Sequence, residues 1–237
     1  MAENIASRPN SEGAPELEFD AHSVAIVAIT YFSDWYPGEL RNTQDTNKIR
    51  GDLALRSFIS ALRLGYQVVV ADGPSSKDFK DNLRQLGIEP LVRETMERSV
   101  GGRQAIKEAA VLDGVRVIIK TEPEKLSLIE DCVPQIARPI IEGTADIVMP
   151  RRNAELNAET YPAYMYESEV LANKWYNDVL HRAGLLPRDK NLEFFFGPIA
   201  LRNDPKIVSL FMEQYGFQGP RVGGWKYIQP EEWSDIV

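Results

Sequence analysis

Short apolar segments alternate with helical patterns along most of the chain, and this alternation limits the folds that are open to it. The first segment, Val24–Tyr31, reads VAIVAITY and is a continuous, β-branched and apolar run. Such a run is typical of a strand that is buried on both faces of a sheet. Strands separated by helices form a mostly parallel sheet with helices on both sides. The sequence therefore predicts an α/β fold with a mostly parallel open sheet flanked by helices.

Turn and capping residues mark where the other elements begin and end. Asp45 or Thr46 is expected to cap a helix that stops at Gly65, and Ser75 or Ser76 a helix that stops at Gly87. The other expected helices cover 103–112, 126–142, 166–183 and 204–215. The other expected strands cover Gln67–Ala71, Glu89–Val92, Val115–Ile119, Ala145–Met149 and Phe194–Leu201.

The two ends of the chain differ in composition from the alternating region. Residues 1–20 are rich in Pro, Gly, Ser, Asn and Glu and are predicted to be a disordered tail. Residues 21–237 are predicted to form a single domain, in which 218–237 is either a flap over a site or a packed tail. The chain has one cysteine, Cys132, so a reducing, cytoplasmic location is expected.

Charge and hydropathy exclude several classes of partner. The net charge is −8, which repels nucleic acid and anionic lipid, so neither is an expected partner. The apolar runs are too short to span a membrane. A phosphate-bearing ligand remains possible where local Lys, Arg or a metal ion supplies positive charge.

Unusual residues follow the expected strands, at the edge of the sheet where open α/β folds bind ligands. Asp72 ends the strand in VVVADGPSS and could accept hydrogen bonds from a base or ribose, although an Asp-Gly turn is also common between a strand and a helix. Gly101-Gly102 open the next helix, where Arg103 could face a phosphate or simply be exposed.

The segment Lys120–Glu124, KTEPE, comes directly after the strand VRVII. Glu122 and Glu124 could together reach a hard divalent cation, which would in turn hold a diphosphate. Thr121 and Glu124 also have the spacing of a helix capping box. The two interpretations are compatible for Glu122, which the capping box leaves free.

The order of these features resembles the GT-A glycosyltransferases. This family has an apolar first strand with a nucleotide-contacting loop, a strand ending in acidic and Gly-Ser residues, a Gly/Arg-containing helix and a strand ending in an Asp-x-Asp metal motif. The corresponding segments here are VAIVAITYF, VVVADGPSS, GGRQAIKEAAVLDG and VRVIIKTEPE, and FFFGPIALR is similar to the segment that borders the acceptor pocket. Glu-Pro-Glu replaces Asp-x-Asp, and Ala71 replaces one acidic residue.

The resemblance implies a glycosyltransferase that moves a sugar from a nucleoside diphosphate sugar to a hydroxyl or amine acceptor. It implies that Asp72, Arg103, Lys120 and Arg151 bind the donor, and that Glu122 and Glu124 hold Mg²⁺ or Mn²⁺. Glu193 or Glu169 would be the catalytic base of an inverting reaction.

Two further functions are compatible with the sequence. One is a sugar-1-phosphate nucleotidyltransferase, although YFSDWYPGELR lacks the Gly-rich basic signature of that family. The other is a GT-A-like protein repurposed for binding or for chemistry without a sugar. Glu169, Asn173, Asn177 and His181 recur every four residues, which predicts a solvated polar stripe opposite an apolar face that includes Leu171 and Trp175.

Overall fold

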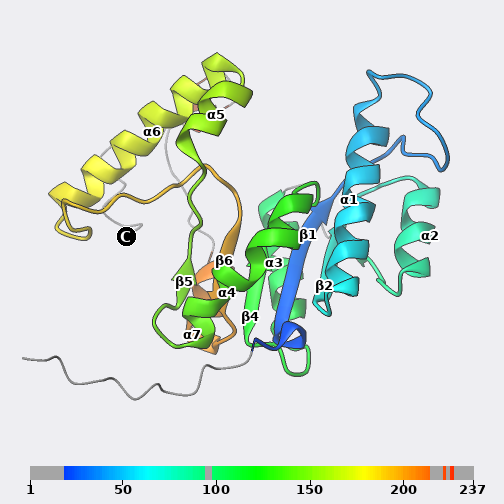
Figure 1. The fold of residues 1–237 in the computed structure, drawn as a ribbon, viewed down its shortest axis with the longest axis horizontal. Helices are drawn as coiled ribbons and strands as arrows, with labels where there is room; N and C mark the ends of the chain where they lie inside the picture. The colour runs from blue at the N-terminus through cyan, green and yellow to red at the C-terminus, as the bar shows by residue number, and fades with distance from the viewer. Residues whose placement is uncertain (1–18, 94–97, 214–220, 223–224, 227–237) are drawn as a thin grey trace, which may run out of the picture.

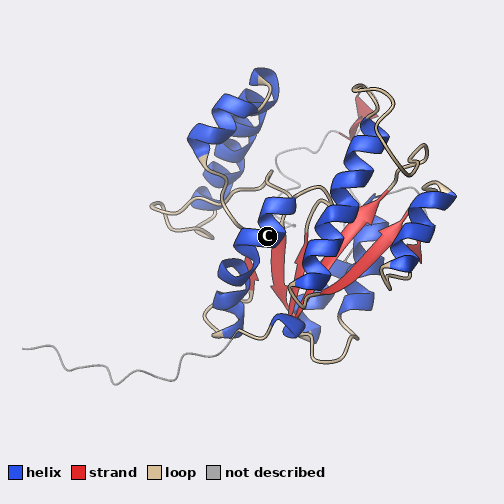
Figure 2. Ribbon diagram, turned by 45° about the vertical axis from the view of Figure 1, so that its right-hand side comes forward, coloured by secondary structure: helices blue, strands red, loops and turns tan. Residues whose placement is uncertain are grey.

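The computed structural model describes residues 19–93, 98–213, 221–222 and 225–226. A six-stranded sheet lies at its centre, with the strand order β3-β2-β1-β4-β6-β5 (Figures 1 and 2). The strands are β1 (Val24–Thr30), β2 (Gln67–Asp72), β3 (Leu91–Val92), β4 (Val117–Lys120), β5 (Ile147–Val148) and β6 (Ile199–Arg202). The strands β1 to β4 are parallel to one another, whereas β6 runs antiparallel to both β4 and β5. The predicted mostly parallel open sheet is confirmed.

Helices connect these strands and cover both faces of the sheet. They are η1 (Ala21–Ser23), α1 (Thr46–Arg63), α2 (Lys77–Gln85), α3 (Arg98–Ala109), the π-helical η2 (Leu128–Cys132), α4 (Val133–Ile141), α5 (Ala154–Thr160), α6 (Ala163–Arg182) and α7 (Pro205–Met212). A separate two-stranded sheet consists of β7 (Arg221–Val222) and β8 (Trp225–Lys226), which pair antiparallel. The tail predicted for 1–20 lies almost wholly outside the described residues, as does most of the C-terminal segment 218–237.

Alternate residues of β1 face two different helix layers, as the pleat of a strand requires. Ala25 and Val27 pack with α3 and α7, while Val24, Ile26 and Ala28 pack with α1, α2, η2 and α4. All five of these side chains are at most 1% exposed. The long apolar run of the first strand is therefore explained by burial on both faces.

Capping residues set the ends of the helices where the sequence placed them. Asp45 accepts from the Lys48 amide at the start of α1, and Ser76 accepts from the Phe79 amide at the start of α2. Gly65 and Gly87 come after these helices at φ of +88° and +79°, a conformation that glycine adopts without strain.

Three sequence predictions differ from the structure, and one helix was not predicted. Helix α3 begins at Arg98, so Gly101 and Gly102 lie inside the helix rather than before it. The predicted strand 194–201 is reduced to β6, and α5 was not predicted at all. Thr121 and Glu124 do not form a capping box, since Glu124 instead binds Arg50.

Gly51 of α1 leaves the space into which Trp35 packs, and this contact holds the loop after β1 against the helix. The indole of Trp35 lies over Gly51, is 4% exposed and donates from Nε1 to Asp52 at 2.9 Å. Lys48, which is 2% exposed, also donates to this Asp52 oxygen at 2.7 Å. A Cβ atom at position 51 would overlap the indole ring. The loop therefore depends on a glycine within a helix.

We expect Gly51→Ala to destabilise the protein by about 1–3 kcal/mol, because the overlap outweighs the gain of roughly 1 kcal/mol in helix propensity. Urea denaturation monitored by circular dichroism measures this. Gly102→Ala is the matched control, because its Cβ would lie 3.4 Å from Ile29 Cδ1 and Lys120 Cε, an ordinary contact. Equal stabilities for the two variants would contradict the packing role of Gly51.

Candidate functional site

The carboxyl ends of β1 and β4 open into a cleft of about 400 Å³, which we call the cationic cleft. Three basic side chains line it, one each from α1, the segment after β3, and the end of β4: Arg50, Arg93 and Lys120. Its other lining residues include Thr30, Tyr31, Phe32, Thr121, Glu122, Glu124 and Gly197. The cleft therefore lies at the edge of the sheet where the sequence predicted a ligand.

Asp72, Lys120 and Glu122 were predicted to line one cleft, and Lys120 and Glu122 do so. Lys120 is half-buried, and its Nζ has no hydrogen-bond or ion-pair partner among the described residues. Gly102 of α3 lies beside this side chain, where an added Cβ would make an ordinary contact 3.4 Å from Lys120 Cε. Gly101 leaves space for Arg93, because an added Cβ there would lie only 2.8 Å from Arg93 Cδ. Gly101 therefore acts within the helix, by admitting one cation to the cleft.

Asp72 lies behind the wall of the cleft rather than in it. Its carboxylate is 2% exposed and accepts from the Thr30 and Ser75 hydroxyls, each at 2.6 Å. Ser75 in turn accepts from the Phe32 amide at 2.8 Å. Thr30 and Phe32 line the cleft, so Asp72 acts on it through these neighbours.

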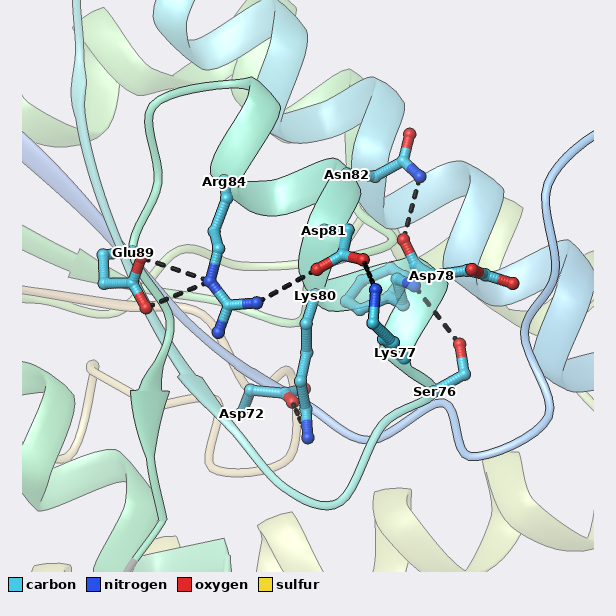
Figure 3. Close-up of polar contacts among 10 residues, drawn as sticks. Asp72, Ser76, Lys77, Asp78, Lys80, Asp81, Asn82, Arg84 and Glu89 are labelled. Carbon is cyan, nitrogen blue, oxygen red and sulfur yellow. Dashed lines mark hydrogen bonds and ion pairs between the residues drawn. The ribbon is translucent and has the colours of Figure 1, made fainter.

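Burial raises the pKa of Asp72, and the hydrogen bonds from Ser75 and Thr30 offset this only in part. Lys80 of α2 points toward the carboxylate, with its Nζ 3.9 Å from Oδ2 (Figure 3). Figure 3 also shows that Arg84 is placed between Asp81 and Glu89, on the outer side of the same helix. Lys80 is therefore the cation of α2 that faces the end of β2.

The two glutamates of the KTEPE segment have different surroundings. Glu124 is 16% exposed and its Oε1 lies 2.5 Å from the Arg50 guanidinium. Glu122 is 48% exposed, lies 3.8 Å from Lys125 Nζ and packs against Gly197, where any Cβ would overlap its carboxylate. Within the described residues, no group of three His, Cys, Asp or Glu side chains could hold a metal ion. Two carboxylates in one cleft suit a divalent cation only where bound phosphates supply further oxygen ligands.

Glu169 and Glu193, the predicted bases, meet on one arginine. Arg152 is 13% exposed and contacts Glu169 Oε2 at 2.7 Å and Glu193 Oε1 at 3.0 Å. Glu193 also accepts from Asn173 at 2.7 Å and from the Phe195 amide at 3.2 Å. Burial alone would raise the pKa of Glu193, but these hydrogen bonds and Arg152 hold it below its ordinary value. A carboxylate with a lowered pKa is a weaker base.

The polar stripe of α6 faces the protein rather than solvent, which corrects the prediction. Asn177 is 5% exposed and accepts from the Leu192 amide at 2.8 Å, while its Nδ2 donates to the Leu192 carbonyl at 2.9 Å. Asn173 accepts from the Phe194 amide at 2.8 Å, and His181 Nε2 lies 2.8 Å from the Lys190 carbonyl. The stripe thus binds the backbone of residues 190–194, which makes no regular strand there.

A second, larger groove of about 930 Å³ adjoins the cationic cleft. Glu124 lines both spaces, while Phe196 lines the groove and Gly197 the cleft. The walls of the groove are mainly apolar and come from the segment after β4, from α4 and from α5. Arg151 lies at its rim, exposed to solvent. Of the predicted donor residues, Lys120 lines the cleft, whereas Asp72, Arg103 and Arg151 lie outside it.

Sequence reasoning missed Arg50 and Arg93, and of the pair Arg151-Arg152 it chose Arg151 as the donor residue. Arg93 comes just after the short strand β3, so its position after a strand could have indicated it. Arg50 lies within α1 and faces the cleft only because that helix packs beside β1. Arg152 was passed over for its exposed neighbour Arg151, since a sequence pattern does not distinguish which of two adjacent arginines turns inward.

Comparison with protein-family models and with curated protein sequences finds no match. Among solved structures, the chain is similar to glucosyl-3-phosphoglycerate synthase from Mycobacterium tuberculosis in complex with Mn²⁺, uridine diphosphate and glucosyl-3-phosphoglycerate, with a TM-score of 0.49 and 11% identity over 77% of this chain. It is also similar to the Mg²⁺ and uridine diphosphate complex of that enzyme, with a TM-score of 0.43, 10% identity and the same coverage. The chain spans 57% of the length of each.

The raised pKa of Asp72 leads to a prediction about stability. The pKa of Asp72 is higher in the folded state than in the unfolded state. The contribution of this pKa shift to the free energy of unfolding is therefore fully present below the unfolded pKa and is lost as the pH rises through the folded pKa. Asn cannot ionise, so its free energy of unfolding lacks this pH dependence. We therefore expect the stability of Asp72→Asn to increase relative to that of the wild type as the pH rises from about 4 to 7.

Urea denaturation at a series of pH values measures this difference. Asp78→Asn, on the outer side of α2, is the control for the loss of a carboxylate. A wild-type protein that gains stability relative to Asp72→Asn over this range would show that the pKa of Asp72 is lowered instead.

Proposed function

We propose that the chain transfers a sugar from a nucleoside diphosphate sugar to a hydroxyl or amine acceptor, and that the cationic cleft binds the donor diphosphate. The observation that carries the proposal is the convergence of Arg50, Arg93 and Lys120 at the carboxyl ends of the strands. A protein of net charge −8 has no general attraction for anions, so a local group of cations indicates a specific anionic ligand.

The positions of the residues suggest their roles. Lys120 would bind the diphosphate directly, because its ammonium group has no partner among the described residues. Arg50 would also bind the diphosphate, once a phosphate oxygen replaces Glu124 as the partner of its guanidinium. As the bond from the sugar to the diphosphate breaks, negative charge develops on the leaving oxygen, and these cations would stabilise it. Asp72 would keep Thr30 and Phe32 in place at the cleft wall.

The adjoining groove would bind the acceptor. Phe196 and Gly197 are consecutive residues that face the two spaces, so an acceptor in the groove would lie next to a donor in the cleft. Arg152 fixes the segment before Phe196 through Glu193. We therefore assign Glu193 and Glu169 a positioning role in place of the role of base, because both form ion pairs with this arginine.

A divalent metal ion has a limited place in this proposal. Glu122 would hold it, because its carboxylate is half exposed in the cleft, and Glu124 would join only when its ion pair with Arg50 opens. When bound, the metal would neutralise charge on the leaving diphosphate.

Removal of the Lys120 ammonium group tests the donor site. We expect Lys120→Met to weaken binding of the nucleotide sugar at least about tenfold, because a hydrogen bond to a charged group contributes roughly 1.5–3 kcal/mol. Titration calorimetry with a panel of nucleoside diphosphate sugars measures this. Lys107→Met is the control, because Lys107 is exposed on α3 and lies outside the cleft. Wild-type affinity in Lys120→Met would contradict the assigned cleft, and a wild type that binds no member of the panel would contradict the function.

Amide substitutions test the metal. We expect Glu122→Gln to reduce the Mn²⁺ dependence of donor affinity with little change in melting temperature, since the amide keeps the shape but loses the charge that a hard cation requires. We expect a smaller effect from Glu124→Gln, because Arg50 already occupies that carboxylate. Glu142→Gln, an exposed position at the end of α4, is the control. If the wild type shows no metal dependence, the cations of the cleft bind the diphosphate without a metal.

A further inference from the structure

Helix α5 buries none of its residues, although it forms one wall of the groove beside the cationic cleft. Figures 1 and 2 show it standing with α6 away from the sheet. Its sequence, AELNAET, has one large apolar side chain, Leu156, which lines the groove and is 57% exposed. A helix of seven residues is too short to be stable by itself in water and normally depends on apolar contacts. Leu156 instead presents a largely uncovered apolar surface to the groove.

The other wall of the groove is the edge of the hydrophobic core. Leu128 and Ile136 are 5% and 6% exposed and belong to one core cluster, and Phe196 packs against the same cluster. All three side chains line the groove together with Leu156. Its volume of about 930 Å³ lies within the roughly 300–1,000 Å³ of small-molecule sites. The groove is therefore large enough for an organic ligand with an apolar body.

The charged side chains of the groove leave one cation without a partner. Four of the five have polar partners, namely Glu124 with Arg50, Lys125 with Glu122, Glu130 with Ser60, and Arg152 with two glutamates. The fifth is Arg151, which is exposed at the rim and has no hydrogen-bond or ion-pair partner among the described residues. An anionic group on a bound ligand would find its counter-ion there.

We propose that the acceptor is a hydroxy acid in which an apolar chain or ring separates the hydroxyl from a carboxylate. The proposal rests on the proposed function, which puts the sugar donor in the cationic cleft. The hydroxyl lies beside Phe196, where the groove meets the cleft, and the carboxylate lies at Arg151. The apolar body lies between Leu156 and Leu128. A hydroxyl is favoured over an amine, because a protonated amine would meet the cations of the cleft.

The transfer step balances with this acceptor. The hydroxyl oxygen forms a bond to the anomeric carbon of the sugar, and the bond from that carbon to the diphosphate breaks. The diphosphate leaves with the electrons of the broken bond, and the hydroxyl proton is released to water. The carboxylate takes no part in the chemistry and serves to hold the far end of the acceptor. A small polar acceptor would leave the apolar walls of the groove uncovered.

A homologous series of acids tests the apolar body. The probes are 4-hydroxybutanoate, 6-hydroxyhexanoate, 8-hydroxyoctanoate and 10-hydroxydecanoate, titrated calorimetrically into the full chain with and without uridine diphosphate. We expect affinity to rise about twofold for each added methylene group, since complete burial of one would give roughly fourfold. Leu156→Ser should weaken binding of the longest acid at least about fivefold and change that of the shortest less than about twofold. Leu185→Ser, at a 55% exposed leucine outside the groove, is the control.

The carboxylate is tested by exchanging the ligand and the arginine together. We expect the wild type to bind 10-hydroxydecanoate about two- to fivefold more tightly than 1,10-decanediol, as is usual for an ion pair that solvent reaches. Arg151→Met should bind the acid and the diol equally. Arg188→Met, at an exposed arginine outside the groove, should keep the preference of the wild type. Circular dichroism and melting temperature check that each variant is folded.

Two results would overturn the proposal. The first is a wild type whose affinity does not rise along the series, or a loss of affinity that Leu185→Ser shares with Leu156→Ser. The second is a preference for the acid that Arg151→Met retains. A chain that binds nucleoside diphosphate sugars but none of the acids contradicts this proposal alone. A chain that binds the acids but no nucleoside diphosphate sugar supports the ligand class of the groove and contradicts the proposed function.

Discussion

The burial of β1 on both faces is the constraint on which the rest of the molecule depends. A strand in this position has no solvent-facing side, so every side chain from Val24 to Ala28 must be apolar and must fit between two helix layers. Polar groups can then appear only where the strand ends. Thr30 is the first of them, and its hydroxyl is already bound to Asp72 of the neighbouring strand. The parallel register puts the end of β4 beside them, and Lys120 and the KTEPE segment therefore reach the same edge of the sheet.

Several charged groups at this edge are matched in pairs or larger clusters, and these contacts give the site its shape. Arg152 joins Glu169 and Glu193, Arg50 joins Glu124, and Lys80 lies near Asp72. A buried arginine is costly without a carboxylate partner, since its charge would then lack compensation. This cluster therefore holds α6, the segment after β5 and the segment before β6 in one arrangement. That arrangement sets the position of Phe196 between the two spaces.

The sequence could predict the parts of this fold that local patterns determine. The strand–helix alternation, the caps at Asp45 and Ser76, and the glycine stops at 65 and 87 each depend on neighbouring residues only. The shared location of Lys120 and Glu122 was equally predictable, because ligands bind at the carboxyl ends of parallel strands.

The failures involve contacts between distant segments. The polar stripe of α6 looked solvated because the backbone of residues 190–194, which it binds, shows no pattern that links it to the helix. Gly101 and Gly102 looked like a loop because glycine lowers helix propensity, yet both lie within α3, and the side chain of Arg93 needs the space at Gly101. Glu124 fitted a capping box by spacing, but an arginine 74 residues away in sequence binds it instead. In each case a tertiary contact overrides the local preference.

The pair between Arg50 and Glu124 shows how such a contact can also serve a site. The arginine is 55% exposed, and ion pairs that solvent reaches contribute only about 0–1 kcal/mol, so little free energy opposes a change of partner. A phosphate offers the guanidinium the same two-oxygen geometry as a carboxylate, with more negative charge. Exchange of Glu124 for a phosphate would also free a second carboxylate beside Glu122. On the proposed function, the ion pair would therefore cancel the charge of Arg50 before the donor binds, and it would supply both a cation and an anion to a bound diphosphate. This coupling would make metal and donor bind together, because the diphosphate would pair with Arg50 and the metal would pair with the carboxylate of Glu124 that Arg50 leaves.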